Sequence, residues 1–190
     1  MSDRQTQILE AAVRVIAQSG VRGLRVEKLA AEAGVSTALI YYHFRDRDGV
    51  LRRALEHINA RAERYTGEVD AGADPRSRLE RMLLLELQSA PEVRENSIAW
   101  GELRASAVFS EDLRDPLRST TRAWVGDVES LIRQAQSEDL ADPVAEPADA
   151  AERLTALVEG LSGRWHSGSI AVERARDLLA GAIAVELGPR

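Results

Sequence analysis

Residues 29–44 read LAAEAGVSTALIYYHF, and no other part of the 190-residue chain says more about its fold. The first half carries small and apolar residues at helical spacing, which predicts a short helix. Gly34 can adopt the left-handed conformation that ends such a helix. Ser36 is a favourable N-cap for a second short helix over residues 37–43. Two short helices joined by a tight glycine turn form a helix-turn-helix.

The second helix of such a motif enters the major groove of DNA, and its first residues meet the base edges. These are Thr37, Ala38 and Leu39, whose hydroxyl and methyl groups suit base and thymine-methyl contacts. Donors that suit phosphate oxygens follow on the same helix and just beyond it: Tyr41, Tyr42, His43, Arg45 and Arg47. The alternative is a motif used only for packing, with the tyrosine pair half-buried against the protein.

Helical periodicity continues on both sides of this stretch. It predicts nine helices and no strand, and therefore an all-α fold. Short helices give way to long ones near residue 46. We therefore expect a helix-turn-helix domain over residues 1–46 and a helical bundle over residues 47–190, joined through the fourth helix. The apolar residues of 76–89 surround the helix, which predicts a central, buried element.

Composition excludes several classes of protein. The chain has no Cys, which rules out disulfides, thiolate zinc sites and a cysteine nucleophile. Its three His have no metal-pair spacing, so we expect no metal and no cofactor. No apolar run reaches the roughly 18 residues of a membrane span, and no signal peptide is recognisable. These observations favour a cytoplasmic protein that does not enter a membrane.

The net charge of −6 is unevenly distributed. Residues 1–60 carry +2 and the remainder carries −8. A basic segment on an acidic body suits a protein that approaches DNA with one face only.

The segment from Ile8 to Leu55 resembles the N-terminal domain of the TetR family of transcriptional regulators. The resemblance lies in the ILEAA run at 8–12, in Gly20, in LAxxAGVS at 29–36, in IYYHF at 40–44 and in RxxVL at 47–51. Residues 157–165 are similar to the C-terminal region of the BetI-like branch. The resemblance implies a bacterial DNA-binding regulator. Ser36, which we expect to cap the reading helix, is also a candidate DNA-binding residue.

Two positions depart from the family pattern. Arg25 stands where the family usually has Thr or Ser, just before the helix that ends at Gly34. Glu27 stands in the first turn of that helix, where a polar or basic residue is common. Glu27 suits the positive end of a helix but would repel a phosphate. Arg25 is a candidate DNA contact that can offset this repulsion.

A helix-turn-helix protein reads two half-sites as a dimer, so a self-association surface is expected. Two apolar stripes near the C-terminus fit a four-helix interface, as the resemblance also implies: Leu154, Leu157, Val158, Leu161, Ala175, Leu178, Leu179, Ala182 and Ile183. The alternative is that both stripes serve only the internal core.

Family members bind a small effector among the central helices, and an apolar cavity with a few polar groups suits that role. The candidate lining residues are Met82, Leu83, Glu86, Trp100, Leu103, Trp124 and Val128. A tryptophan and a carboxylate together could hold a cation. The simpler interpretation is that the tryptophans pack the core and that Glu86 reaches solvent.

The sequence therefore predicts a homodimeric repressor that binds a palindromic operator in double-stranded DNA and is released by an unidentified small-molecule effector. A small helical enzyme is the rival from another class. The chain has no phosphate-cradling glycine loop, no nucleophile elbow and no His-carboxylate cluster, so we expect no catalytic residues. An activator or an architectural DNA-binding protein is the third alternative.

Overall fold

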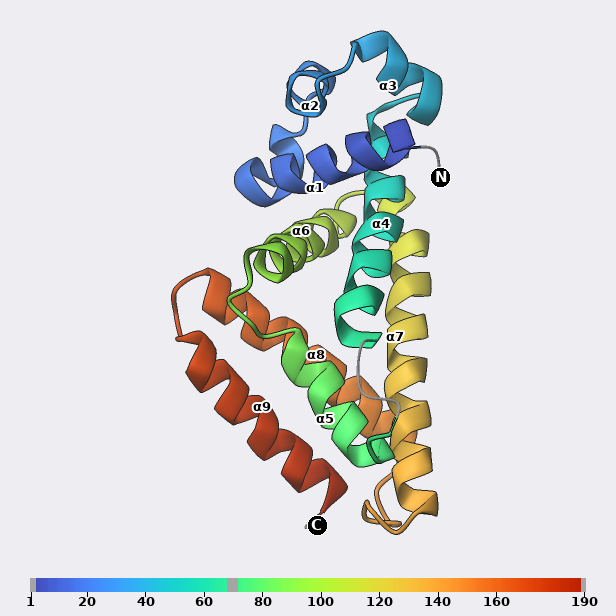
Figure 1. Ribbon diagram of the computed structural model, residues 1–190, viewed down its shortest axis with the longest axis vertical. Helices are drawn as coiled ribbons and strands as arrows, with labels where there is room; N and C mark the ends of the chain where they lie inside the picture. The colour runs from blue at the N-terminus through green and yellow to red at the C-terminus, as the bar shows by residue number, and fades with distance from the viewer. Residues whose placement is uncertain (1–2, 68–71, 189–190) are drawn as a thin grey trace. The chain divides into compact units, whose positions relative to one another are not determined.

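The computed structural model describes residues 3–67 and 72–188, and these form nine α-helices without a strand (Figure 1). The expected fold class is therefore confirmed. The helices are α1 (Asp3–Gly23), α2 (Val26–Ala33), α3 (Thr37–Phe44), α4 (Arg47–Gly67), α5 (Pro75–Leu85), α6 (Pro91–Ala107), α7 (Glu111–Ser137), α8 (Pro147–His166) and α9 (Val172–Leu187). Within the described ranges, none of these helices is long and apolar enough to cross a membrane.

The chain divides into two compact units. The first comprises Met1–Arg61 and Glu95–Thr120, and the second comprises Ala62–Arg94 and Thr121–Arg190. The predicted DNA-binding segment, 1–46, falls within the first unit. The boundary after residue 46 concerns which residues serve DNA binding, so it stays a prediction.

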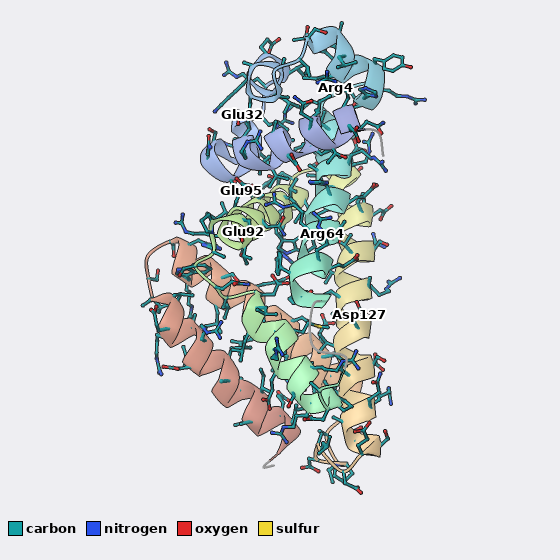
Figure 2. The ribbon with its side chains drawn as sticks, in the orientation of Figure 1. Arg4, Glu32, Arg64, Glu92, Glu95 and Asp127 are labelled. Carbon is teal, nitrogen blue, oxygen red and sulfur yellow. The ribbon has the colours of Figure 1, made fainter. Side chains whose placement is uncertain are left out.

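The first unit has one apolar core. It is built from the buried faces of α1, α2, α3 and α4 and from parts of α6 and α7. Ion pairs tie neighbouring helices together at the edge of this core. The Glu32 carboxylate on α2 lies 2.7 Å from Arg14 Nε on α1, and Glu95 on α6 lies 3.0 Å from Arg61 Nη1 on α4 (Figure 2 labels both glutamates).

The second unit is centred on α8 and α9, which run side by side in opposite directions (Figure 1). Helix α5 packs against α9, and the second half of α7 completes the core. Buried aliphatic side chains from all four helices meet there, among them Leu83, Val128, Val158 and Leu179.

Helix α5 differs from its expected form in two ways. It ends at Leu85 rather than at residue 89, because the chain continues there with 3₁₀-type hydrogen bonds. The Glu86 and Leu87 amides donate to the carbonyls three residues back. It is also not buried all round. Leu79, Leu83 and Leu87 are fully buried, while the other leucines and Met82 are only partly covered.

Candidate functional site

Helices α2 and α3 meet in the turn that the sequence predicted. Gly34 has φ 64° and ψ 37°, the left-handed conformation, and it ends α2. The Val35 amide donates to the Ala30 carbonyl at 3.0 Å, which closes the turn. The Ser36 hydroxyl accepts from the Leu39 amide at 3.3 Å, so it caps α3 as expected.

Helix α3 has one face in the core and one face in solvent. Ile40 and Phe44 are buried, as their four-residue spacing predicts. The opposite face carries exposed Thr37, Ala38, Tyr41 and Tyr42, with Leu39 and His43 partly exposed. Tyr42 is 81% exposed and its ring lies edge-on to His43, with the ring centroids 5.0 Å apart. Tyr42 is therefore not used for internal packing, whereas half of the surface of Tyr41 is covered.

A strained turn follows α3. Arg45 has φ 66° and ψ −54°, and the Asp46 amide donates to the Phe44 carbonyl at 2.8 Å, which together define a γ-turn. Strain of this kind concentrates at functional sites. Arg45 is exposed beside the outer face of α3. Asp46 then caps α4, because its carboxylate accepts from the Gly49 amide at 2.6 Å.

The start of α2 lies at Val26, with Arg25 at the N-cap position. Arg25 makes no side-chain capping bond, and both Arg25 and Glu27 are exposed. Arg47 differs from the other basic candidates, because its guanidinium faces the protein. Nε donates to the Leu24 carbonyl at 2.8 Å, and Nη2 donates to the Val21 carbonyl.

The structure does not bring all seven candidate pocket residues into one core. Leu103 is buried and Trp100 is packed in the core of the first unit. In the second unit, Leu83 and Val128 are fully buried, while Met82 and Trp124 pack more openly against the same core.

Glu86 does not simply reach solvent. Its Oε2 accepts a hydrogen bond from the Tyr65 hydroxyl at 2.9 Å. Burial raises the pKa of the Glu86 carboxyl to about 7, and the Tyr65 hydrogen bond opposes this rise. The backbone around Glu86 is held by α9, since Arg176 Nη1 donates to the Leu84 and Leu87 carbonyls at 2.7 and 2.9 Å.

The nine candidate dimer residues separate into two groups. Six are buried inside the protomer, where they pack α8 and α9 into the core of the second unit: Leu154, Val158, Leu161, Ala175, Leu179 and Ile183. These six therefore have no surface to offer a partner. Leu157, Leu178 and Ala182 keep part of their surface, and Val185 on the same helix as the last two is 82% exposed.

Comparison with known families decides what this arrangement is. Residues 8–54 match the profile of bacterial regulatory proteins of the tetR family. Residues 75–188, more than half of the chain, match the C-terminal profile of the BetI-type transcriptional repressors. The chain belongs to the tetR family of bacterial regulatory proteins.

Relatives of this tetR-family regulator match over almost its whole length. A candidate TetR-family regulator from Rhodococcus sp. has 52% identity and a TM-score of 0.93, with 99% of this chain and 100% of that chain covered. A candidate regulator from Saccharomonospora viridis, solved in complex with choline, has 28% identity and a TM-score of 0.88, with both chains fully covered. The regulator BetI of Brucella anthropi is 27% identical over 97% of this chain and 93% of its own.

The regulator is therefore a DNA-binding transcription factor with an N-terminal helix-turn-helix and not an enzyme. Sequence reasoning missed the side chains that hold its backbone in place, above all Glu102, Arg76 and Arg176. Their partners are main-chain groups of residues distant in sequence, and no residue pattern signals such contacts.

Proposed function

We propose that this tetR-family regulator acts in the cytoplasm as a homodimeric repressor of a palindromic operator and that a small-molecule effector releases it. The observation that carries DNA reading by α3 is its outer face, which is exposed while the inner face is locked in the core. Two copies would place their α3 helices on half-sites one helical turn apart, about 34–36 Å.

Each exposed residue has a proposed role at the DNA. Thr37, Ala38 and Leu39 lie in the first turn of α3, where side chains reach base edges. Tyr41, Tyr42 and His43 follow on the same helix and suit phosphate oxygens. Arg45, directly after α3, and Arg25, at the N-cap of α2, are exposed cations that supply the attraction that Glu27 opposes.

Thr37→Val should weaken sequence-specific binding about 5- to 100-fold, because it removes a base-reading hydroxyl and keeps the shape of the side chain. The measurement is a titration on a DNA duplex that the wild-type protein enriches from a random-sequence library. Thr120→Val on α7 is the matched control, since it makes the same change in a residue whose hydroxyl donates to the Leu117 carbonyl of its own helix.

Equal binding by the Thr37 and Thr120 variants would contradict reading by α3. A footprint on the same duplex should protect two symmetric half-sites, and a single protected site would count against the dimer. Deleting the gene should raise transcription from the operator that the footprint defines, whereas an activator would show a fall.

The dimer surface that we propose lies on the outer faces of α8 and α9. Leu157, Leu178 and Ala182 are partly uncovered there, and Val185 is exposed. Two such helices from each protomer make a four-helix interface. The six buried residues of the original stripes support this surface from below by fixing α8 against α9.

For the effector we propose a small organic cation of the quaternary-ammonium type. The Saccharomonospora viridis relative was solved with choline, and the C-terminal region is of the BetI type. In this chain the Glu86 carboxylate supplies the negative charge and Trp124 supplies a partly uncovered aromatic ring in the same unit. The bound cation would compensate a carboxylate that is otherwise costly to ionise at this depth.

This proposal predicts a pH dependence. A cation binds the ionised form of Glu86, whose pKa lies at about 7, so choline affinity should rise about tenfold between pH 6 and pH 8. Titration calorimetry with choline at the two pH values measures the change. Glu86→Gln should bind choline weakly and with no such dependence. A wild-type affinity that is the same at both pH values would contradict the role of Glu86.

In the protein without choline, the same carboxyl makes folding stability fall, rather than rise, as the pH increases. Below its ordinary pKa of 4.5, Glu86 is neutral in the folded and in the unfolded protein, so its contribution to stability is fully present at such pH values. The contribution is lost as the pH rises through about 7, because the folded protein must then hold a buried charge. Glu86→Gln should remove this part of the pH dependence of the melting temperature.

A further inference from the structure

The segment Val21–Leu24, the 21–24 segment, joins the long helix α1 to the helix-turn-helix. It begins after Gly20, where the backbone of α1 breaks with φ 69° and ψ 171°. That combination is essentially restricted to glycine. Gly20 and the 21–24 segment therefore set the direction of α2 relative to α1.

Arg47, at the start of α4, holds one side of the 21–24 segment. Two nitrogens of its guanidinium donate to the carbonyls of Leu24 and Val21, which end a helical turn. The third nitrogen, Nη1, lies 3.7 Å from an Asp48 oxygen. Each guanidinium nitrogen thus has an acceptor or an ion-pair partner within the protein, while 38% of the side chain stays exposed.

Glu102, on α6, holds the other side of the same segment. Its Oε2 accepts from the Val21 amide at 3.3 Å. A Cβ on Gly20 would lie 2.7 Å from this oxygen, so the carboxylate fills the space that the glycine leaves open. Arg47 and Glu102 therefore bind opposite polar groups of one short piece of backbone, and all the residues concerned lie in the first unit.

The far end of α2 has a separate attachment. Gln7 Nε2 on α1 donates to the Ala33 carbonyl at 2.8 Å, and Leu29, Ala30 and Ala33 are packed in the core. Loss of a bond to the 21–24 segment would therefore leave α2 folded and anchored at its C-terminal end, while its N-terminal end gained freedom to tilt.

We propose that Arg47 and Glu102 are positioning residues for DNA recognition: they fix the 21–24 segment, and thereby the direction of α2 and α3, without contacting DNA. For Arg47 this role replaces the phosphate contact expected from the sequence. The inference rests on the reading of DNA by α3 proposed above.

Salt dependence distinguishes positioning from phosphate contact. A cation that neutralises a phosphate contributes about 0.9 to the slope of log affinity against log salt concentration. A positioning residue contributes nothing to that slope, but its loss misplaces α3 and lowers the preference for the specific duplex over random DNA. The two roles thus predict different readouts for the same substitution.

The experiment uses the full-length protein, the library-selected duplex and a duplex of unrelated sequence. Arg47→Met and Glu102→Ala should each weaken binding to the selected duplex about 10- to 100-fold, the range for a lost bond to a charged group. Both should leave the salt slope and the affinity for unrelated DNA unchanged. Arg45→Met is the comparison, and it should weaken both affinities and lower the slope by about 0.9.

Conservative variants keep the test valid if the larger changes disturb folding. Arg47→Lys keeps the charge and loses the two-pronged donor, so it should behave like Arg47→Met, whereas a phosphate contact would survive it. Glu102→Gln keeps an acceptor oxygen and should bind the selected duplex within about threefold of wild type. Hydrogen exchange should show faster opening of the amides of 21–29 in Arg47→Lys, with the amides of α4 unchanged.

A slope that falls by about 0.9 in Arg47→Met, or full rescue by Arg47→Lys, would overturn the positioning role of Arg47. Wild-type binding by Glu102→Ala would overturn that of Glu102. These outcomes differ from a failure of the proposed function. If α3 did not read DNA, Thr37→Val would also bind the selected duplex like wild type.

Discussion

Arg76→Met should lower the free energy of unfolding by about 3–5 kcal/mol. Arg76 is only 3% exposed, and its guanidinium donates to the Leu140 and Gly188 carbonyls at 2.9 and 2.8 Å and to Glu80 at 3.1 Å. A methionine fills similar space but removes the charged donor of the two carbonyls and of one Glu80 bond, and polar groups that lose their hydrogen bonds are costly when buried. Urea denaturation followed by circular dichroism measures the change.

Arg153→Met is the matched control. Arg153 also makes two bonds, to both Glu186 oxygens at 2.6 Å, but its side chain is 55% exposed. Water replaces such bonds readily, so this variant should unfold close to the wild-type midpoint. If the two arginine variants lost similar stability, burial would not be what makes the Arg76 contacts important.

Gly20→Ala should lower the free energy of unfolding by about 3 kcal/mol, the upper end for a residue forced into a glycine-only conformation. The new Cβ also meets Glu102 Oε2 at 2.7 Å and pushes the carboxylate off the Val21 amide. The variant should therefore lose sequence-specific DNA binding in addition to stability. Thermal and urea unfolding measure the first effect, and titration on the selected duplex measures the second.

Gly34→Ala is the control for this glycine. Gly34 also has a positive φ, of 64°, but no other atom lies within 4 Å of the Cβ position. Its left-handed conformation is accessible to alanine at about 1 kcal/mol, so Gly34→Ala should be the milder change. A larger loss from Gly34→Ala than from Gly20→Ala would contradict the strain assigned to Gly20.

Local features of the fold were predictable because each depends on neighbours in sequence. Gly34 ends α2 and Ser36 caps α3, as residue type and spacing indicate. The buried face of α3 followed from the four-residue spacing of Ile40 and Phe44. The end of α5 did not, because its last turn is tightened and then held by Arg176 from a helix 89 residues away.

The candidate sites were harder to predict for the same reason. Periodicity shows that α8 and α9 each have an apolar face, but not whether the protomer or a partner covers it, and the structure assigns Leu154, Leu179 and four others to the protomer core. Residue type made Arg47 a phosphate candidate, yet nothing in the sequence shows that its donors point at Val21 and Leu24. Charge predicts the donor, and only the fold reveals the acceptor.

Within residues 3–67 and 72–188, four arginines each bridge two main-chain carbonyls: Arg47, Arg76, Arg114 and Arg176. Every residue type supplies a carbonyl, so substitutions at the acceptor positions leave the acceptors in place. Substitution of the arginine removes the link, and lysine restores only part of it. Substitutions of the arginine should therefore lower stability, whereas substitutions at the acceptor positions should not break the link. Related chains that drift freely at the acceptor positions should still retain arginine at the four donor positions.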